Sequence, residues 1–313
     1  MQINKRYIAT AVAALMGMMT AFAQQIAVVS AKGKTSVSQT LQKAIEDAAE
    51  GSVIYLPGGG FQLPDSVKIT KKLSIIGIGY VAKSNNADGN TVIGGNLYFN
   101  ANSSGGSIMG CYISGNVYIG NDGADVHNIV LKYCSLNGIQ IKGSNCTGTI
   151  VNQNYLRGSS SFGSAAATLS NNVISSLSGL TGGIVKNNIF KSSSGFSNCS
   201  ISRNIFLSSQ SIGSDCTSSE NMNGGENPVD LGELGWEVLF KKYNGGAVTP
   251  ASDFHFADDY IGQFKHIGIY GGTGFDPSGQ PPLPFFMARS VAGQTDASGN
   301  LNIKIRVQPG ENK

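Results

Sequence analysis

The sequence predicts an all-β protein whose short strands stack in parallel, one per coil, as a β-helix. Glycine supplies 42 of the 313 residues and charged residues only 13% of them, a composition that favours turns between short strands and excludes coiled coils. A short segment with two apolar positions recurs along the middle of the chain, and a single helical pattern precedes these repeats.

Residues 1–23 have the pattern of a signal peptide. Lys5 and Arg6 precede an apolar run over 8–19, and Ala21-Phe22-Ala23 follows as a signal-peptidase site. The run is too short to span a membrane. We therefore expect a mature chain that begins near Gln24 and is exported to the periplasm, the cell surface or the medium, with no membrane span. The alternative interpretation is that the apolar run over 8–19 forms a buried strand or helix.

A helix over 36–49 is predicted next. Ser36 and Gln39 form a capping-box pattern, and Gly51 lies where a C-terminal cap belongs. Apolar residues follow at helical spacing, namely Val37, Leu41, Ala44, Ile45 and Ala48. We expect this helix to cover the first coil. Strands are predicted at 52–56 and 73–77, the first followed by a turn over 57–60.

Five segments of six residues align with one another, at 131–136, 151–156, 169–174, 185–190 and 201–206, with weaker copies near 111–113 and 220–222. The first position is apolar in all five, and so is the last. Stacking one such strand per coil places identical positions about 4.8 Å apart and joins each apolar column into a continuous core. A coil cannot bury its core alone, so the ends need caps.

The fourth position of the repeat forms a column of its own. It reads Cys111, Cys134, Asn154, Asn172, Asn188, Asn204 and Asn221. Inward asparagines at a bend can bond the amides of the coils above and below, as amide ladders do in other stacked sheets. Cysteine is small and apolar enough for the same position. We therefore predict a structural asparagine ladder.

These features resemble the secreted right-handed parallel β-helix proteins of the pectin and pectate lyase superfamily. The resemblance rests on the opening helix, the strand and turn over 54–59, the strand at 73–77 and the Asn-Asn-Ile-Phe coils, and it implies a right-handed solenoid. The segment 267–272 and the prolines at 281–284 are similar to the end of β-helix proteins common in Bacteroidetes. A left-handed β-helix is disfavoured because its strict hexapeptide period is missing.

The predicted domains are the signal peptide (1–23), a β-helix with an N-terminal cap (24–226), and a C-terminal cap with a β extension (227–313). Residues 230–243 predict a short helix or two around Trp236. Apolar residues alternate over 301–307, which predicts a half-buried strand. Residues 285–292 are its expected hairpin partner across a turn at 298–300.

Five cysteines are an odd number for an exported protein. Cys111 and Cys134 share the fourth column, and Cys199 and Cys216 each precede a column asparagine by five residues, whereas Cys146 has no counterpart. Buried free thiols are favoured over disulfides between neighbouring coils. Metal-binding spacing such as C-x-x-C is absent, so we expect no metal centre built on cysteine.

Acidic residues are the scarce component. No Asp or Glu lies between Asp125 and Asp215, so the most regular coils cannot hold the carboxylate pair of a hydrolase or a calcium site. Asp122, Asp125 and His127 form a candidate cation or acid/base cluster, with an exposed turn as the alternative. A similar cluster lies at 253–259. We expect no cofactor. If calcium binds, these two clusters are its only candidate positions.

Outward positions beside the repeat predict a different site. They are Lys132, Tyr133, Asn152, Gln153, Asn171, Lys186, Asn187 and Arg203. Amides and aromatic rings suit sugar hydroxyls and pyranose faces, and cations suit uronates. The alternative is ordinary solvated surface.

Two function classes remain open. The first is a secreted or surface β-helix that binds a polysaccharide or cell-surface glycan, or acts as an adhesin, without catalysis. The second is a polysaccharide lyase or glycoside hydrolase acting on a uronate-rich glycan. The missing carboxylates favour the first. A net charge of +3 gives no case for nucleic acid as a partner.

Overall fold

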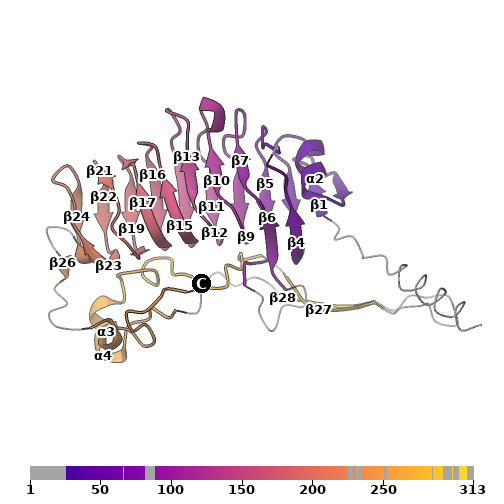
Figure 1. Ribbon diagram of the computed structural model, residues 1–313. Coiled ribbons are helices and arrows are strands. Elements are labelled where there is room, and N and C mark those ends of the chain that lie inside the picture. Colours follow the sequence, from indigo (N-terminus) through magenta and orange to yellow (C-terminus); the bar gives the residue numbers. More distant parts are fainter. Residues whose placement is uncertain are drawn as a thin grey trace, which may run out of the picture.

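The computed structural model describes residues 26–65, 67–81, 89–224, 228–229, 235–249, 252–283, 285–291, 298 and 303–308. The predicted signal peptide lies outside these residues. The described chain is an all-β right-handed parallel β-helix, as predicted (Figure 1). No helix within the described part is long and apolar enough to cross a membrane.

One long sheet forms the first side of the solenoid. In pairing order its strands are β2 (Thr35–Ser38), β1 (Ile26–Val29), β3 (Val53–Tyr55), β5 (Ser74–Ile76), β8 (Ser107–Met109), β11 (Val130–Lys132), β14 (Thr149–Asn152), β16 (Ala167–Ser170), β19 (Ile184–Lys186), β22 (Ser200–Ser202) and β24 (Thr217–Ser219). From β3 onward all pairs are parallel, whereas β1 pairs antiparallel with β2 and β3.

A second sheet faces the first. Its strands are β4 (Gly59–Gln62), β6 (Thr91–Gly94), β9 (Tyr112–Ile113), β12 (Ser135–Leu136), β15 (Tyr155–Ser161), β17 (Val173–Ser178), β20 (Ile189–Phe190), β23 (Ile205–Gln210), β25 (Asn221–Gly224) and β26 (Pro228–Val229). Further short strands lie on a third side, namely β7 (Leu97–Phe99), β10 (Val117–Ile119), β13 (Ile139–Ile141), β18 (Leu180–Thr181) and β21 (Phe196–Ser197).

The register confirms the alignment of the repeats. Leu131 pairs with Val151 in the first sheet, and Leu136 pairs with Leu156 in the second. The same correspondence continues to Ile201 and Phe206. All ten apolar positions of the two columns are buried in one core cluster. The apolar columns therefore supply the interior of the solenoid.

The N-terminal helix is shorter than predicted. α2 covers Leu41–Asp47, with Thr40 as its N-cap, because the Thr40 Oγ1 accepts the Lys43 N–H at 3.2 Å. Val37 instead lies on β2 and is 59% exposed, so the capping box at Ser36 is wrong. The C-cap is Ala48, so the cap at Gly51 is wrong as well. The glycines expected in a turn at 59–60 begin β4.

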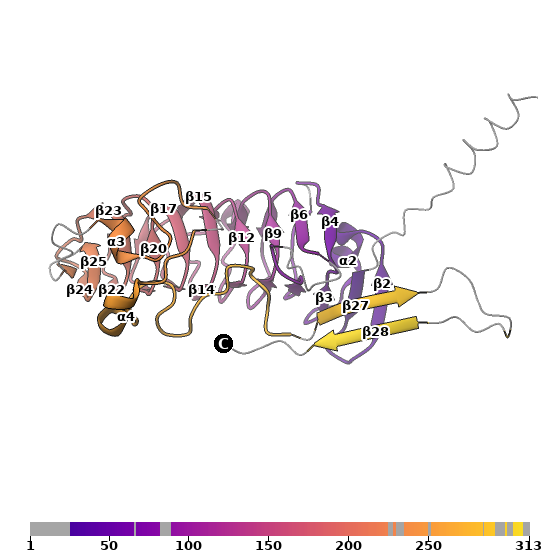
Figure 2. The ribbon, with the colours of Figure 1, turned by 90° about the horizontal axis from the view of Figure 1, so that it is seen from below.

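The C-terminal region is placed differently from the expected cap. Residues 235–249 and 252–283, with α3 (Trp236–Leu239) and α4 (Asp258–Phe264), lie along one side of the β-helix (Figures 1 and 2). The reason is an outward apolar column on the second sheet, which this region buries: Tyr155, Val173, Ile189, Ile205 and Met222. β27 (Phe285–Val291) and β28 (Ile303–Gln308) form the predicted antiparallel hairpin.

All five cysteines are free thiols in the structure. Burial raises the pKa of the Cys134 thiol to about 12, and it raises the pKa of Cys111 as well. Cys199 and Cys216 lie on neighbouring coils, where the Cys199 N–H donates to the Cys216 Sγ at 3.3 Å.

Candidate functional site

The bend between the two long sheets positions the candidate side chains. One residue per coil is left-handed there, and we call Tyr133, Gln153, Asn171, Asn187 and Arg203 the bend column; their φ values lie between +54° and +58°. Left-handed backbone is unfavourable for residues other than glycine and asparagine. The conformation turns the chain sharply, so that the bend residue faces outward and the next residue faces inward.

The inward neighbours are the buried asparagines 154, 172, 188, 204 and 221. Asn188 Oδ1 accepts from both the backbone N–H and the Nδ2 of Asn172, at 3.0 and 2.9 Å. Asn188 Nδ2 donates in turn to Leu169 O and Asn204 Oδ1, each at 3.0 Å. The same bonds recur from Asn154 to Asn221. Each inward amide thus links consecutive coils.

Two outward residues of the bend column, Asn171 and Asn187, bind residues 265–283, a segment here called the strap. Asn187 Nδ2 donates to the carbonyls of His266 and Gly268, at 2.6 and 3.2 Å. Asn171 Nδ2 donates to the carbonyls of Ile269 and Gly271, at 2.9 and 2.6 Å. These contacts leave Asn171 3% and Asn187 2% exposed. Both amides point outward as predicted, but the strap covers them.

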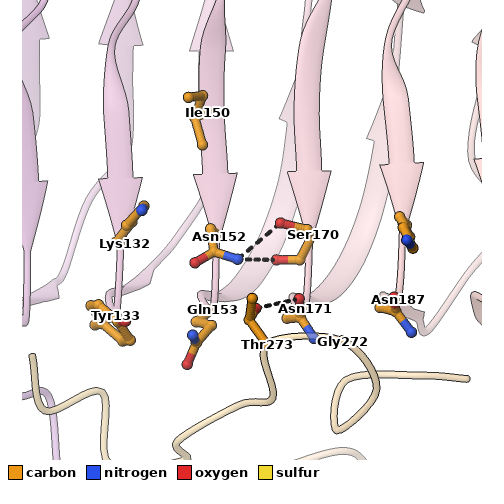
Figure 3. Close-up of a pocket in the computed structure, with 11 residues that line it drawn as sticks. Lys132, Tyr133, Ile150, Asn152, Gln153, Ser170, Asn171, Asn187, Gly272 and Thr273 are labelled. Carbon is orange, nitrogen blue, oxygen red and sulfur yellow. Dashed lines mark hydrogen bonds between the residues drawn. The ribbon is translucent and has the colours of Figure 1, made fainter. Parts of the chain in front are cut away.

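A pocket of about 570 Å³ lies between the bend column and the strap (Figure 3). Its lining residues are Lys132, Tyr133, Ile150, Asn152, Gln153, Ser170, Asn171, Lys186, Asn187, Gly272 and Thr273. The structure thus brings seven of the eight predicted outward residues to one pocket. Four consecutive strands of the first sheet, β11, β14, β16 and β19, carry its floor.

Charge in the pocket is positive. Lys132 is half-buried and Lys186 exposed, and neither forms an ion pair within the described residues. Asn152 donates through Nδ2 to the Ser170 Oγ at 2.8 Å, and its Oδ1 points away from Ser170 in Figure 3. The pocket therefore offers two cations together with amide and hydroxyl groups.

Arg203 is the predicted residue that does not join the pocket. Its Nε donates to Glu220 Oε2 at 2.7 Å, and Glu220 Oε1 lies 3.1 Å from His266 Nε2. Arg203 is therefore not a free cation beside the pocket, because Glu220 on the next coil neutralises it. Pairing with Arg203, and to a smaller extent with His266, holds the Glu220 pKa below its usual range.

Tyr133 lies at one end of the pocket. Burial raises the pKa of this phenol, and the Asp276 carboxylate of the strap raises it further. The phenol consequently stays protonated at neutral pH, where it can donate a hydrogen bond.

The acidic cluster does not converge on one point. Lys68 pairs with Asp122 and lowers its carboxyl pKa. Asp125 accepts from Asn145 Nδ2 at 3.2 Å, and His127 Nδ1 lies 3.0 Å from Thr147 Oγ1. Each of the three thus has a separate partner. In the cluster at 253–259, Asp253 pairs with His255. The described residues contain no group of three His, Cys, Asp or Glu side chains placed to hold a metal ion.

Sequence reasoning missed the strap side of the pocket. Gly272 and Thr273 lie about 100 residues after Asn171 in the sequence, and no local pattern connects them with the bend column. A signal was present in the fifth repeat position, which is apolar from Tyr155 to Met222 although it faces outward. An outward apolar column requires a cover.

Comparison with known proteins identifies the superfamily. Residues 29–245 match the model of a family described as rhamnogalacturonase A/epimerase, pectate lyase-like. Comparison with curated proteins gives no match, and comparison with solved structures gives none. Because the family model matches well over half of the chain, the protein belongs to the rhamnogalacturonase A/epimerase, pectate lyase-like family.

Proposed function

We propose that this exported protein binds an anionic, uronate-bearing polysaccharide in the pocket between the bend column and the strap, without catalysis. Its family supports a polysaccharide-related role. The observation that carries the proposal is the pair Lys132 and Lys186, which line one pocket in which none of the lining residues is acidic. A site whose lining carries two cations and no acid favours carboxylate-bearing ligands over neutral ones.

The arrangement favours a polymer over a small anion. Lys132 is on β11 and Lys186 on β19, with β14 and β16 between them. Three strand spacings separate the two lysine positions by about 14 Å along the solenoid axis. A chain that runs along this axis can meet both ammonium groups and present its hydroxyls to Asn152 and Gln153 between them.

The test measures the affinity of the mature protein for polygalacturonate at low and at physiological salt. Replacing Lys132 and Lys186 together with serine removes one half-buried and one exposed charge, each worth roughly 1 kcal/mol of attraction at contact in water. We expect a loss of affinity of roughly 10- to 30-fold, and weaker binding by the parent at higher salt.

The matched control is Lys32→Ser with Lys34→Ser. These lysines are exposed in the turn between β1 and β2, so the control removes the same charge away from the pocket. Equal losses in the two double variants would show a non-specific charge effect and would refute the pocket as the binding site.

A lyase acting on the same polymer is the second candidate. It is favoured by the adjacency of Lys132 and Tyr133 in the pocket, since an amine and a phenol are groups able to move protons in a β-elimination. A hydrolase finds less support, because hydrolysis generally needs two carboxyl groups. Appearance of unsaturated, ultraviolet-absorbing ends during incubation, and their loss in Tyr133→Phe, would favour the lyase over simple binding.

A further inference from the structure

We propose that residues 271–274 of the strap, here called the wall loop, make the pocket selective for unbranched anionic chains. The inference rests on the proposed function and adds the substrate feature that the site distinguishes. The wall loop includes the lining residues Gly272 and Thr273 and lies outside residues 29–245, which match the family model. This side of the pocket is therefore a feature of the present chain beyond the matched domain.

The wall loop is held firmly against the β-helix. Asn171 bonds it twice: Nδ2 donates to Gly271 O at 2.6 Å, and Oδ1 accepts from the Thr273 Oγ1 at 3.1 Å. Just before the loop, Ile267 and Ile269 are buried against the outward apolar column. Hydrogen bonds and apolar burial together fix its position, so that the loop cannot move aside without losing both.

Close packing adds to this rigidity. A Cβ on Gly271 would come 2.3 Å from the His266 carbonyl oxygen and 2.4 Å from Asn187 Nδ2. Gly268 has φ +74°, and a Cβ there would approach Ile205 Cδ1 within 2.5 Å. Gly271, the first residue of the loop, is thus tightly enclosed, whereas a Cβ on Gly274 would meet nothing within 4 Å, so that the loop is anchored at Gly271 and at Thr273.

The two sides of the pocket consequently differ. On the sheet side, Ile150 is 38% exposed and the strands form an open surface. On the other side stands the wall loop (Figure 3). A sugar chain along the solenoid axis can carry substituents toward solvent or across the open strand surface, whereas a branch toward the strap meets the anchored wall loop. Close packing makes such a clash costly.

The experiment compares the affinity of the mature protein for polygalacturonate and for xylogalacturonan, which has the same charged backbone with xylose branches. We expect the parent to bind the unbranched polymer at least tenfold more tightly. Asn171→Gly keeps the left-handed backbone but releases the wall loop, and the preference should fall to about threefold. Thr273→Ala, which removes bulk from the wall while leaving Asn171 in place, should lower the ratio in the same direction.

The control is Asn198→Gly, the same substitution at another left-handed asparagine (φ +52°), whose backbone N–H bonds Asp215 on the next coil. Its ratio should equal that of the parent. Equal affinity of the parent for both polymers, or an undiminished preference in both Asn171→Gly and Thr273→Ala, would overturn the wall loop as the selective element while leaving the proposed function intact. Binding to neither polymer would instead refute the proposed function.

Discussion

Asn187 and Asn188 are adjacent in sequence and identical in chemistry, yet they stabilise different parts of the molecule. Asn188 is inside the solenoid and bonds the coils on either side. Asn187 is outside and bonds the carbonyls of the strap. The left-handed φ of +58° at Asn187 interrupts the alternation of the strand, so that Asn187 faces outward like Lys186 before it and Asn188 faces inward. Backbone conformation, rather than residue type, therefore assigns each amide its partner.

Asn188→Leu should produce the largest effect. It leaves the N–H and Nδ2 of Asn172 without their acceptor in the buried core, and each unsatisfied buried group costs roughly 1–3 kcal/mol. We expect a loss of about 3 kcal/mol in the free energy of unfolding, measured by denaturant titration. An unchanged midpoint would contradict the stacking of the inward asparagines.

Asn187→Gly tests the outward asparagine of the pair, which bonds the strap. Glycine keeps the left-handed backbone, and water can reach the freed strap carbonyls, so the expected loss is only about 1 kcal/mol. Hydrogen exchange should accelerate over 266–271 and stay unchanged in β19 and β22. Faster exchange in those strands would mean that Asn187 supports the coils as well as the strap.

Glu220→Gln should give the smallest effect, visible only through pH. Pairing with Arg203, and then with His266, lowers the Glu220 pKa from 4.5, so this contribution is complete above pH 4.5 and is lost as pH falls through the lower folded-state value. The pair is partly exposed and contributes only a few tenths of a kcal/mol. Unfolding midpoints of parent and variant should converge in acid. A constant difference at every pH would refute the ion-pair account.

The repeats were readable from sequence because each coil repeats one pattern. Leu131, Val151 and Leu169 are apolar at the same position, and their pairing follows directly. The strap was not readable, since Gly268 and Gly271 bond residues 65 to 100 positions away with no shared period. Arg203 differs, because Glu220 occupies the same repeat position one coil later, 17 residues on, so that their stacking follows from the period itself. Local periodicity predicts the core, whereas long-range contacts decide which outward residues remain accessible.

The central claim is that an anionic polysaccharide occupies the pocket between the bend column and the strap. Hydrogen exchange of the mature protein with and without polygalacturonate tests it most directly, because it locates the ligand on the chain. We predict slower exchange at the ends of β11, β14, β16 and β19 and across residues 271–274, with no change in β7, β10 and β13 on the third side. Slower exchange confined to the third side, or none under conditions where the polymer is bound, would contradict the claim.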